Sequence, residues 1–436
     1  MQYIFIDSNK KIGGIEKLFI DMALYLNQMG EEVYFLVEYE DSIYYRYLGQ
    51  LENVHFIIRN SNIAIKFLSN KEIKNEKQYI LNKLDTSKNY VVIAAYFKTF
   101  QQALAFFGSE KNFKLIHYWA HPQSWALELF TKKNIITKRK ENICYNYQRK
   151  LLQELDRRNA DIRGSETGAI YNNWFYNLQI DRENVIPLPI KKLKIATKES
   201  NTPNIENNKK KILWCGRFTY FKNEAIIHIH KTLEKIAVEH KNLKLEYHII
   251  GFGNSKNTTF VKKSIIPNKV KVIYHGMVNH EELIAYYLDC DIGIGMGTTI
   301  RQMALAGLPS IIIDSVNSEN KQALKANWLY DSFVGDAGDN FYCEIAGHTL
   351  TYRTELKTLL DSIILDPEKL IKVGIECKNY VEKNHDEDLV MQKFINYVNN
   401  STFNGVNYPL YRVNSLERLR RNILRKIKKF LKERIV

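Results

Sequence analysis

The stretch GIGMGTTIRQMALAGLPSIIID, residues 293–314, decides the fold class of this chain. It reads as the end of a strand, a glycine turn and the start of a helix, followed after Gly307 and Pro309 by a second apolar strand. α/β domains build phosphate sites in this way, because a helix that opens directly after a strand presents its N-terminal amides to an anion. The stretch therefore predicts an α/β domain with a phosphate site at the glycine turn.

The alternation of strands and helices extends in both directions from this stretch. Residues 354–399 read as helical, with a last helix at 385–399. Apolar and amphipathic runs predict strands at 211–216, 244–253, 271–276, 291–296 and 309–314, and helices at 223–240, 280–290 and 299–306. This half of the chain therefore predicts a Rossmann-like domain with a parallel sheet.

The N-terminal half has the same architecture without the same sequence. A strand is predicted at 2–7, a glycine turn leads into a helix that ends at Gly30, and a second strand follows at 32–38. Further strands are predicted at 90–96, 113–119, 160–165 and 184–189. The predicted fold class is therefore α/β, with two Rossmann-like domains that face across a cleft and bind ligands at the carboxyl ends of their strands.

A polar stretch places the boundary between the two domains. Residues 191–210 are rich in Lys and Asn and are typical of a linker. We therefore expect an N-terminal domain at 1–190, a linker at 191–210, a C-terminal domain at 211–385, a helix at 386–400 that returns to the first domain, and a linker with a basic amphipathic tail at 401–436.

Composition indicates a globular protein rather than a disulfide-rich or membrane-spanning one. A chain of 436 residues is too long for one ordinary core, and 45% hydrophobic with 25% charged residues indicates a globular protein. The five cysteines have no metal-ligand spacing, which favours a reducing compartment without disulfides. We expect neither a signal peptide nor a membrane span, because no apolar run approaches the roughly 20 residues that cross a bilayer.

Nearly half of the net charge of +15 lies in the C-terminal segment 415–436. Residues 415–436 contain nine Lys or Arg against two Glu, and their apolar residues follow one face of a helix. Such a helix can lie on an anionic membrane surface, where each cation contributes about 1 kcal/mol; the alternative is packing on the protein or on a partner chain. Nucleic acid is a poorer explanation, because the tail has one aromatic residue and no recognised binding fold. We therefore expect a cytoplasmic protein, peripheral at the inner face of the cell membrane.

Two cations follow the first strand of the C-terminal domain. In WCGRFTYFKNEA (214–225), Arg217 and Lys222 lie in a loop between a predicted strand and a predicted helix. Cations at the end of a buried strand can hold a diphosphate and neutralise a leaving group. The alternative is that both are solvated loop cations.

Glycine turns follow several other predicted strands. The turns are IIGFGN (249–254) and YHGMV (274–278) in the second half, and Gly13-Gly14 before the first helix, where missing side chains let a ligand approach the backbone. Each turn by itself is a weak signal. The two turns of the second half, the loop of Arg217 and Lys222 and the turn at 293–299 all lie in one domain and together predict a convergent site.

Two histidines follow a strand of the first domain, in the segment HYWAHPQSW. A neutral imidazole there can orient hydroxyl groups, and we choose His121, the one nearer the loop, over His117. The HxxxH spacing would suit zinc on a helix, but Pro122 argues against a helix and no third ligand is evident. We therefore expect no metal.

The series GGIE, GR(F)…KN, GFGN, HGMV…EEL and GMGTT…ALAGLPS resembles the retaining glycosyltransferases of family 4, which have the GT-B fold. The resemblance runs from about residue 3 to 399 and is firmest over 211–314. It implies transfer of a sugar from a nucleotide donor, without a metal, to an acceptor held by the N-terminal domain.

The resemblance also implies roles for single residues. Arg217 and Lys222 would bind the donor diphosphate, and His121 would lie beside the donor sugar and the acceptor. The remaining donor-binding positions that it implies are Gly13, Gly14, Gly216, Gly251, Gly253, Met277, Gly295, Met296, Gly297, Thr298, Thr299 and Gln302.

The chain departs from the family at the turn itself. The family often carries two glutamates separated by seven residues here, one near the donor sugar and one on the ribose hydroxyls, and these positions align with Ile294 and Gln302. Ile294 cannot hydrogen-bond a sugar. Gln302 has one acceptor and two donor positions, but it lacks the charge assistance that roughly doubles the strength of a hydrogen bond. Donor identity and catalytic rate are therefore open.

The sequence predicts a metal-independent, hexosyltransferase-like glycosyltransferase. It would move a sugar with retention from a nucleotide-sugar, with a UDP-linked donor favoured and no other cofactor, to a lipid-linked acceptor or growing surface glycan such as a capsule or lipopolysaccharide. One alternative is a catalytically weak GT-B subunit that acts as a scaffold for another transferase, and another is an inverting or polyol-phosphate transfer on the same fold.

Overall fold

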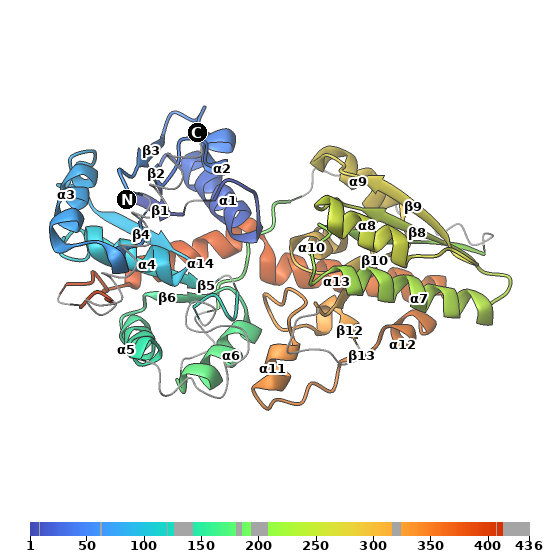
Figure 1. Cartoon of the computed structure of the whole chain (residues 1–436). Coiled ribbons are helices and arrows are strands. Elements are labelled where there is room, and N and C mark those ends of the chain that lie inside the picture. The colour runs from blue at the N-terminus through green and yellow to red at the C-terminus, as the bar shows by residue number, and fades with distance from the viewer. Residues whose placement is uncertain are drawn as a thin grey trace, which may run out of the picture. The chain divides into compact units, whose positions relative to one another are not determined.

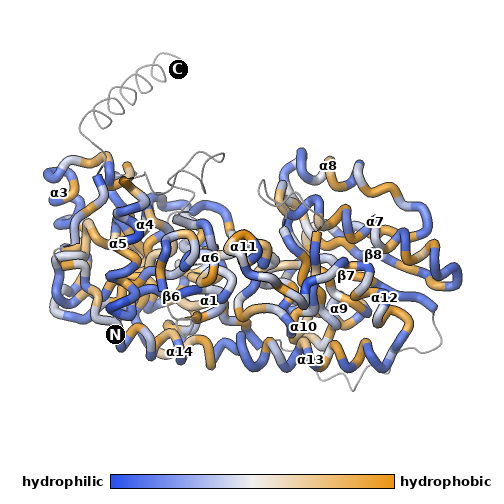
Figure 2. The backbone as a smooth tube through the Cα atoms, turned by 90° about the horizontal axis from the view of Figure 1, so that it is seen from below, coloured by the Kyte–Doolittle hydropathy of each residue, from blue (hydrophilic) through white to orange (hydrophobic). Residues whose placement is uncertain are grey.

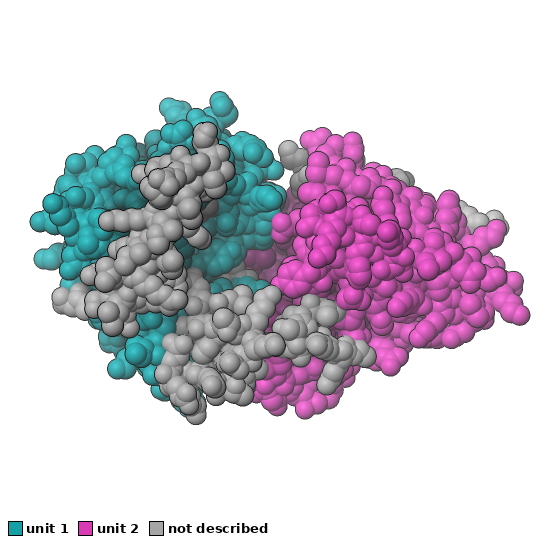
Figure 3. Space-filling model, viewed as in Figure 1, with its two compact units in different colours: residues 1–163, 176–180, 394–436 teal, residues 164–175, 181–393 magenta. Residues whose placement is uncertain are grey.

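The computed structural model describes residues 1–7, 9–61, 63–119, 121–125, 143–179, 185–192, 208–315, 324–406 and 408–412. The chain divides into two compact units (Figure 3). Unit 1 comprises Met1–Arg163, Tyr176–Ile180 and Phe394–Val436, and unit 2 comprises Gly164–Phe175 and Asp181–Lys393. The basic tail at 415–436 lies outside the described residues.

Unit 1 is built on a parallel six-stranded sheet with the order β3-β2-β1-β4-β5-β6 (Figure 1). Its strands are β1 (Gln2–Ile6), β2 (Glu32–Val37), β3 (Val54–Ile58), β4 (Tyr90–Ala94), β5 (Phe113–Trp119) and β6 (Asp161–Arg163). Its helices are α1 (Gly14–Gln28), α2 (Ile43–Leu48), α3 (Asn70–Leu81), α4 (Phe97–Phe107) and α5 (Ile143–Arg157), with the 3₁₀ turn η1 (Ile65–Phe67). This strand order is that of a doubly wound Rossmann sheet.

The central strands of unit 1 are buried on both faces, which is why they read as continuous apolar runs. Every residue of β1 and of β4 is buried. The chain returns to this sheet near its C-terminus, where the Leu115 amide of β5 donates to the Phe403 carbonyl at 2.8 Å. The Lys114 ammonium also donates to the Asn399 carbonyl at 2.7 Å.

Unit 2 contains a seven-stranded sheet with the order β13-β12-β11-β10-β7-β8-β9. Its strands are β7 (Lys209–Cys215), β8 (Lys244–Ile250), β9 (Lys271–Gly276), β10 (Ile292–Gly295), β11 (Ser310–Ile313), β12 (Lys325–Trp328) and β13 (Thr354–Glu355). β7 to β11 are parallel, whereas β12 and β13 pair antiparallel. The short antiparallel edge was not predicted from the sequence.

Helices accompany this sheet in unit 2. They are α6 (Glu166–Tyr176), α7 (Asn223–Glu239), α8 (Ser255–Ser264), α9 (His280–Asp289), α10 (Thr298–Leu305), α11 (Phe341–Ile345), α12 (Leu356–Asp361) and α13 (Pro367–His385), with the 3₁₀ turn η5 (Leu329–Asp331). α14 (Glu387–Asn400) begins in unit 2 and ends in unit 1. Hydrophobic and hydrophilic residues alternate along α13, as expected for a helix with one packed face (Figure 2).

The strand predicted at 184–189 is wrong. Of residues 185–189, which are the part of this segment that the structure describes, only Val185 forms an isolated bridge, and the following residue, Ile190, forms another with Asp386. Pro187 and Pro189 explain the difference, because proline has no backbone N–H to donate to a sheet.

Each sheet has a topological switch point, where chain connections leave in opposite directions. In unit 1 it lies between β1 and β4, and in unit 2 between β7 and β10. Open α/β sheets bind ligands beyond the carboxyl ends of the strands at such points. In unit 2, the loop after β7 and the turn after β10 are therefore the expected places for a ligand.

All five cysteines are buried and free. Among the described residues, none of the helices combines the length and the apolar character that crossing a membrane requires.

Candidate functional site

The loops that follow β7, β8 and β9 are joined by backbone hydrogen bonds. The Gly216 amide donates to the Ile250 carbonyl at 3.0 Å, and the Gly251 amide donates to the Gly276 carbonyl at 2.8 Å. The carboxyl ends of three strands are therefore held as one surface in unit 2.

Close packing of these loops requires two of the predicted glycines. A Cβ on Gly251, which has φ +152°, would lie 2.0 Å from the carbonyl oxygen of Gly216. A Cβ on Gly253 would lie 2.4 Å from the carbonyl oxygen of Phe218. Loop packing thus accounts for both glycines, and their donor-binding role stays a prediction.

Arg217 and Lys222 lie in the loop between β7 and α7, as the sequence indicated. Arg217 is exposed, whereas Lys222 is partly buried, and its ammonium would lie 3.7 Å from a Cβ placed on Gly216. Burial, and then the charge of Arg217, lower the pKa of Lys222 to about 8. The structure therefore brings two cations close together at the end of a strand, where they repel one another and favour an anion.

The glycine turn after β10 opens α10 against this loop. Gly297 has φ +72°, a conformation that favours glycine, and no side chain caps the helix at this position. The Thr299 hydroxyl donates to the Cys215 carbonyl at the end of β7 at 2.8 Å. The amides at the start of α10 and the two cations are thus parts of the same edge of the sheet.

The other residues of the turn differ in what they can offer. Gly295 and Met296 are buried, so only their backbone is placed to face a ligand, whereas Thr298 is partly exposed. Ile294 is fully buried in the apolar core of unit 2. Gln302 accepts a long bond of 3.5 Å from the Tyr287 hydroxyl. The position aligned with the first family glutamate is therefore a core position in this chain.

Exposed apolar side chains belong to the same three loops. Met277, a predicted donor-binding residue, is 75% exposed. Tyr220 and Phe252, which were not predicted as site residues, are 70% and 47% exposed. Aromatic residues in loops after strands were a visible signal, but only the structure shows that these two do not enter the core.

The Gly13-Gly14 turn occupies the corresponding place in unit 1, after β1. Gly13 is the N-cap of α1 in an extended conformation, and a Cβ on Gly14 would meet no atom within 4 Å. Neither strain nor packing within the described residues therefore demands glycine at position 14.

Two buried carboxylates that were not predicted as site residues from the sequence, Asp7 and Glu16, lie beside this turn. The side-chain amide of Asn9 donates to Asp7 at 3.2 Å and also to Glu16, and the Tyr44 hydroxyl donates to Asp7. Burial, and then the charge of Asp7, raise the pKa of Tyr44 well above its ordinary value. The signal that could have found them is Asp7 directly after a strand and Glu16 in the first turn of the following helix.

His117 lies inside unit 1. Its ring is fully buried on β5, and its Nδ1 lies 2.8 Å from Asp161, which also accepts from the Trp119 indole at 2.7 Å. Arg163 forms an ion pair with the same carboxylate. Burial lowers the pKa of His117, so the ring is a neutral donor to Asp161. This network gives His117 a role in the core.

His121 lies beyond the end of β5. The Gln123 amide donates to its Nδ1 at 3.1 Å. In the neutral ring the proton is therefore on Nε2, and His121 presents a hydrogen-bond donor rather than a base at that atom.

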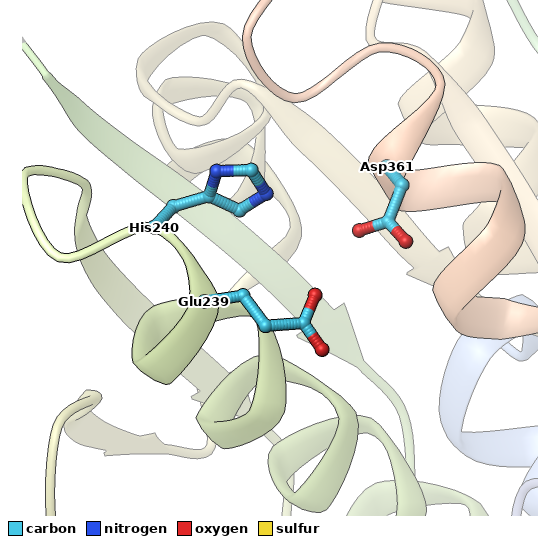
Figure 4. Close-up of side chains that lie close together, drawn as sticks. All are labelled: Glu239, His240 and Asp361. Atoms are coloured by element: carbon cyan, nitrogen blue, oxygen red, sulfur yellow. The ribbon is translucent and has the colours of Figure 1, made fainter.

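One possible metal-binding group occurs among the described residues, but it is far from these strand ends in the topology. Glu239, His240 and Asp361 have side-chain atoms within 4.8 Å of one another, at the C-terminal end of α7 and on α12 (Figure 4). The Lys357 ammonium forms ion pairs with Glu239 at 2.6 Å and with Asp361 at 2.7 Å. A lysine thus already supplies the positive charge at this group, and we assign no metal to it.

Solved structures with this architecture include several glycosyltransferases. A glycosyltransferase from Rickettsia africae ESF-5 is 16% identical with a TM-score of 0.57, over 91% of this chain and 97% of that chain. Anabaena HepE in complex with UDP and glucose is 15% identical with a TM-score of 0.55, over 92% and 99%. A trehalose-6-phosphate synthase is 11% identical with a TM-score of 0.55, over 92% and 100%.

These comparisons establish the fold. The chain has two Rossmann-like α/β domains and the GT-B architecture of these glycosyltransferases. No protein-family model and no curated protein sequence matches it.

Proposed function

We propose that this protein is a glycosyltransferase that binds a nucleotide-sugar at the carboxyl edge of the sheet in unit 2. The observation that carries the proposal is the pair Arg217 and Lys222 beside the uncapped start of α10. No carboxylate forms an ion pair with Lys222 in the described part of the chain. Its lowered pKa means that burial and the charge of Arg217 destabilise the charged form of this lysine. A diphosphate supplies the missing negative charge and accepts hydrogen bonds from the helix amides.

The donor is then held from several sides. Arg217 and Lys222 bind the diphosphate and stabilise it as it leaves, and the amides of Thr298 and Thr299 bind phosphate oxygens. Gln302 binds the ribose through its side-chain amide. Gly216, Gly251, Gly253, Gly295, Met296, Gly297 and Met277 form the remaining wall of the donor site. We favour a UDP-linked hexose, because the similar HepE structure holds UDP and glucose.

The transfer proceeds with retention at the anomeric carbon. The bond from that carbon to the diphosphate breaks as the acceptor hydroxyl attacks from the same face, and the departing diphosphate takes the hydroxyl proton. Glycosyl transfer with retention is described for the trehalose-6-phosphate synthase that shares this fold. Gly13 and Gly14 leave room for the sugar, since nothing in the described part of unit 1 fills the space beside Gly14. His121 donates from Nε2 to a sugar or acceptor hydroxyl, and no metal takes part.

The acceptor is a lipid-linked or growing surface glycan, such as a capsule or lipopolysaccharide precursor. The basis is the sequence of the tail at 415–436, whose nine cations and apolar stripe suit the cytoplasmic face of an anionic membrane. The tail would hold the enzyme where such acceptors lie.

Calorimetric binding of UDP, GDP, ADP and CMP tests the proposal. One nucleoside diphosphate should bind with micromolar affinity, and Arg217→Ala should weaken it at least tenfold, since a charge-assisted bond to phosphate contributes about 1.5 kcal/mol or more. Arg217 is exposed, so its replacement should leave the melting temperature unchanged. If no nucleotide binds, the donor site is refuted and the scaffold alternative takes its place.

A further inference from the structure

Arg301, on the inner side of α10, makes contacts that the donor-binding roles above do not explain. It is the fourth residue of the helix and only 1% exposed. Its Nη1 donates to the carbonyl of Gly297 at 2.9 Å, and its Nη2 donates to the carbonyl of Asp336. One side chain therefore connects the glycine turn to a separate loop.

The third contact of Arg301 fixes the protonation of a buried histidine. Its Nε lies 3.2 Å from Nε2 of His385, which is fully buried, and Nδ1 of the same ring lies 3.1 Å from the Leu188 carbonyl. Burial, and then the charge of Arg301, lower the pKa of His385 well below its ordinary value. His385 is therefore neutral, with its proton on Nδ1, and accepts from Arg301.

The loop at 335–340 holds the turn from the other side. The Gly297 amide donates to the Ala337 carbonyl at 3.2 Å. Gly338 has φ +87°, and a Cβ there would lie 2.8 Å from the Cβ of Met296. The Asp336 carboxylate in turn accepts from the Gly338 amide at 2.9 Å and from the Asn340 side chain at 2.6 Å. Both the amide and the carbonyl of Gly297 are thus fixed.

Helix electrostatics make the position of Arg301 unusual. The N-terminus of a helix is its positive end, so a cation in the first turn is unfavourable unless an anion lies nearby. The carboxyl groups of Asp336 and Asp339 are near enough to feel the charge of Arg301, although burial raises the pKa of both. The positive end of the helix and the buried charge of Arg301 would both stabilise an anionic ligand at the start of α10.

We propose that Arg301 is a positioning residue for the diphosphate: it fixes Gly297 so that the first amides of α10 point at the phosphates, and His385 and the 335–340 loop hold Arg301 in place. The inference rests on the proposed function and extends it to a residue that does not touch the ligand. We therefore expect loss of the Arg301 contacts to weaken mainly the binding of the phosphate end of the nucleotide.

The test compares Arg301→Lys with Arg353→Lys. Arg353 is a matched control, because it is also a buried arginine of unit 2 (7% exposed), but it forms ion pairs with Asp314 and with Glu344 at 2.9 Å rather than contacts with the turn. The affinities for UDP and UMP are measured for each variant and for the wild type. Arg301→Lys should weaken UDP about tenfold and UMP less than threefold, because UMP lacks the outer phosphate; Arg353→Lys should change neither.

A second variant covers the case in which Arg301→Lys does not fold. His385→Leu keeps Arg301 and both of its carbonyl bonds but removes the acceptor for Nε, and it should reduce the preference for UDP over UMP about threefold. The inference is overturned if folded variants keep the wild-type preference, or if UDP and UMP weaken equally. If the wild type binds neither nucleotide nor another nucleoside diphosphate, the proposed function itself has failed, and that result is visible before any variant is made.

Discussion

The ammonium of Lys222 gives the sharpest test of the donor site, because it titrates within an accessible range. Burial and Arg217 lower its pKa to about 8, whereas an ordinary lysine has a pKa of about 10.4. In the free protein, about nine in ten Lys222 side chains are charged at pH 7 and about one in ten at pH 9. A bound diphosphate brings the pKa back toward its ordinary value, so binding at pH 9 requires the uptake of a proton.

The affinity for UDP should therefore fall about tenfold between pH 7 and pH 9, or about 1.4 kcal/mol. The ligand does not produce this trend, because a terminal phosphate has its second pKa near about 6 and is already ionised. The free energy of unfolding of the ligand-free protein changes with pH in the opposite direction. From about pH 8 to 10.4 the unfolded chain binds more protons at this group than the folded one, so the free energy of unfolding rises with pH.

Calorimetry at pH 7, 8 and 9, in buffers of different ionisation enthalpy, measures both the affinity and the proton uptake. Lys222→Arg keeps its charge throughout and should give a flat pH profile. Arg217→Ala removes a neighbouring charge and should shift the midpoint of the profile to higher pH. Equal wild-type affinity at pH 7 and pH 9, or an unchanged slope in Lys222→Arg, would refute the assignment of Lys222 to the diphosphate.

Two further experiments separate ligand roles from structural roles. Gly251→Ala should destabilise the protein by about 2–4 kcal/mol, because Gly251 has a positive φ and the added Cβ would collide with the Gly216 carbonyl. In Gly14→Ala the added Cβ would meet no atom, so the melting temperature should stay within a few degrees of the wild-type value. Sugar transfer by Gly14→Ala should nevertheless fall at least tenfold. Thermal unfolding and a transfer assay on the two variants check this, and a stable Gly251→Ala would contradict the packing argument. In liposome flotation, the intact chain should bind anionic vesicles better than a chain ending at Asn414, and equal flotation would remove the membrane role of 415–436.

The sequence predicted most of the two sheets, because buried parallel strands leave a simple record. β1, β5 and β9 are short apolar runs bounded by turn residues, and the structure has them within one residue of the predicted bounds. The strand predicted at 184–189 was wrong, because its apolar pattern includes Pro187 and Pro189, which have no backbone N–H to donate to a sheet. It also missed the antiparallel edge of β12 and β13, whose strands are too short to show a period.

The sequence indicated where the candidate site residues lie in the fold, and their roles in binding stay predictions. Arg217, Lys222 and Gly297 were selected because they follow strands, and they do lie at one edge of the sheet in unit 2. Gly251 and Gly253 looked like ligand glycines, yet the structure gives each a packing reason that only the neighbouring loop reveals.

Local pattern by itself determined most of the alternation of strands and helices, and with it the class of fold, because hydrophobic periodicity and turn chemistry act over a few residues. Only the tertiary structure decided which polar groups are partners. His117 and Asp161 are 44 positions apart, and Arg301 and His385 are 84 apart, yet each pair is buried and in contact. Burial and contact fix charge, tautomer and pKa, and both depend on distances that the chain sets only after it has folded.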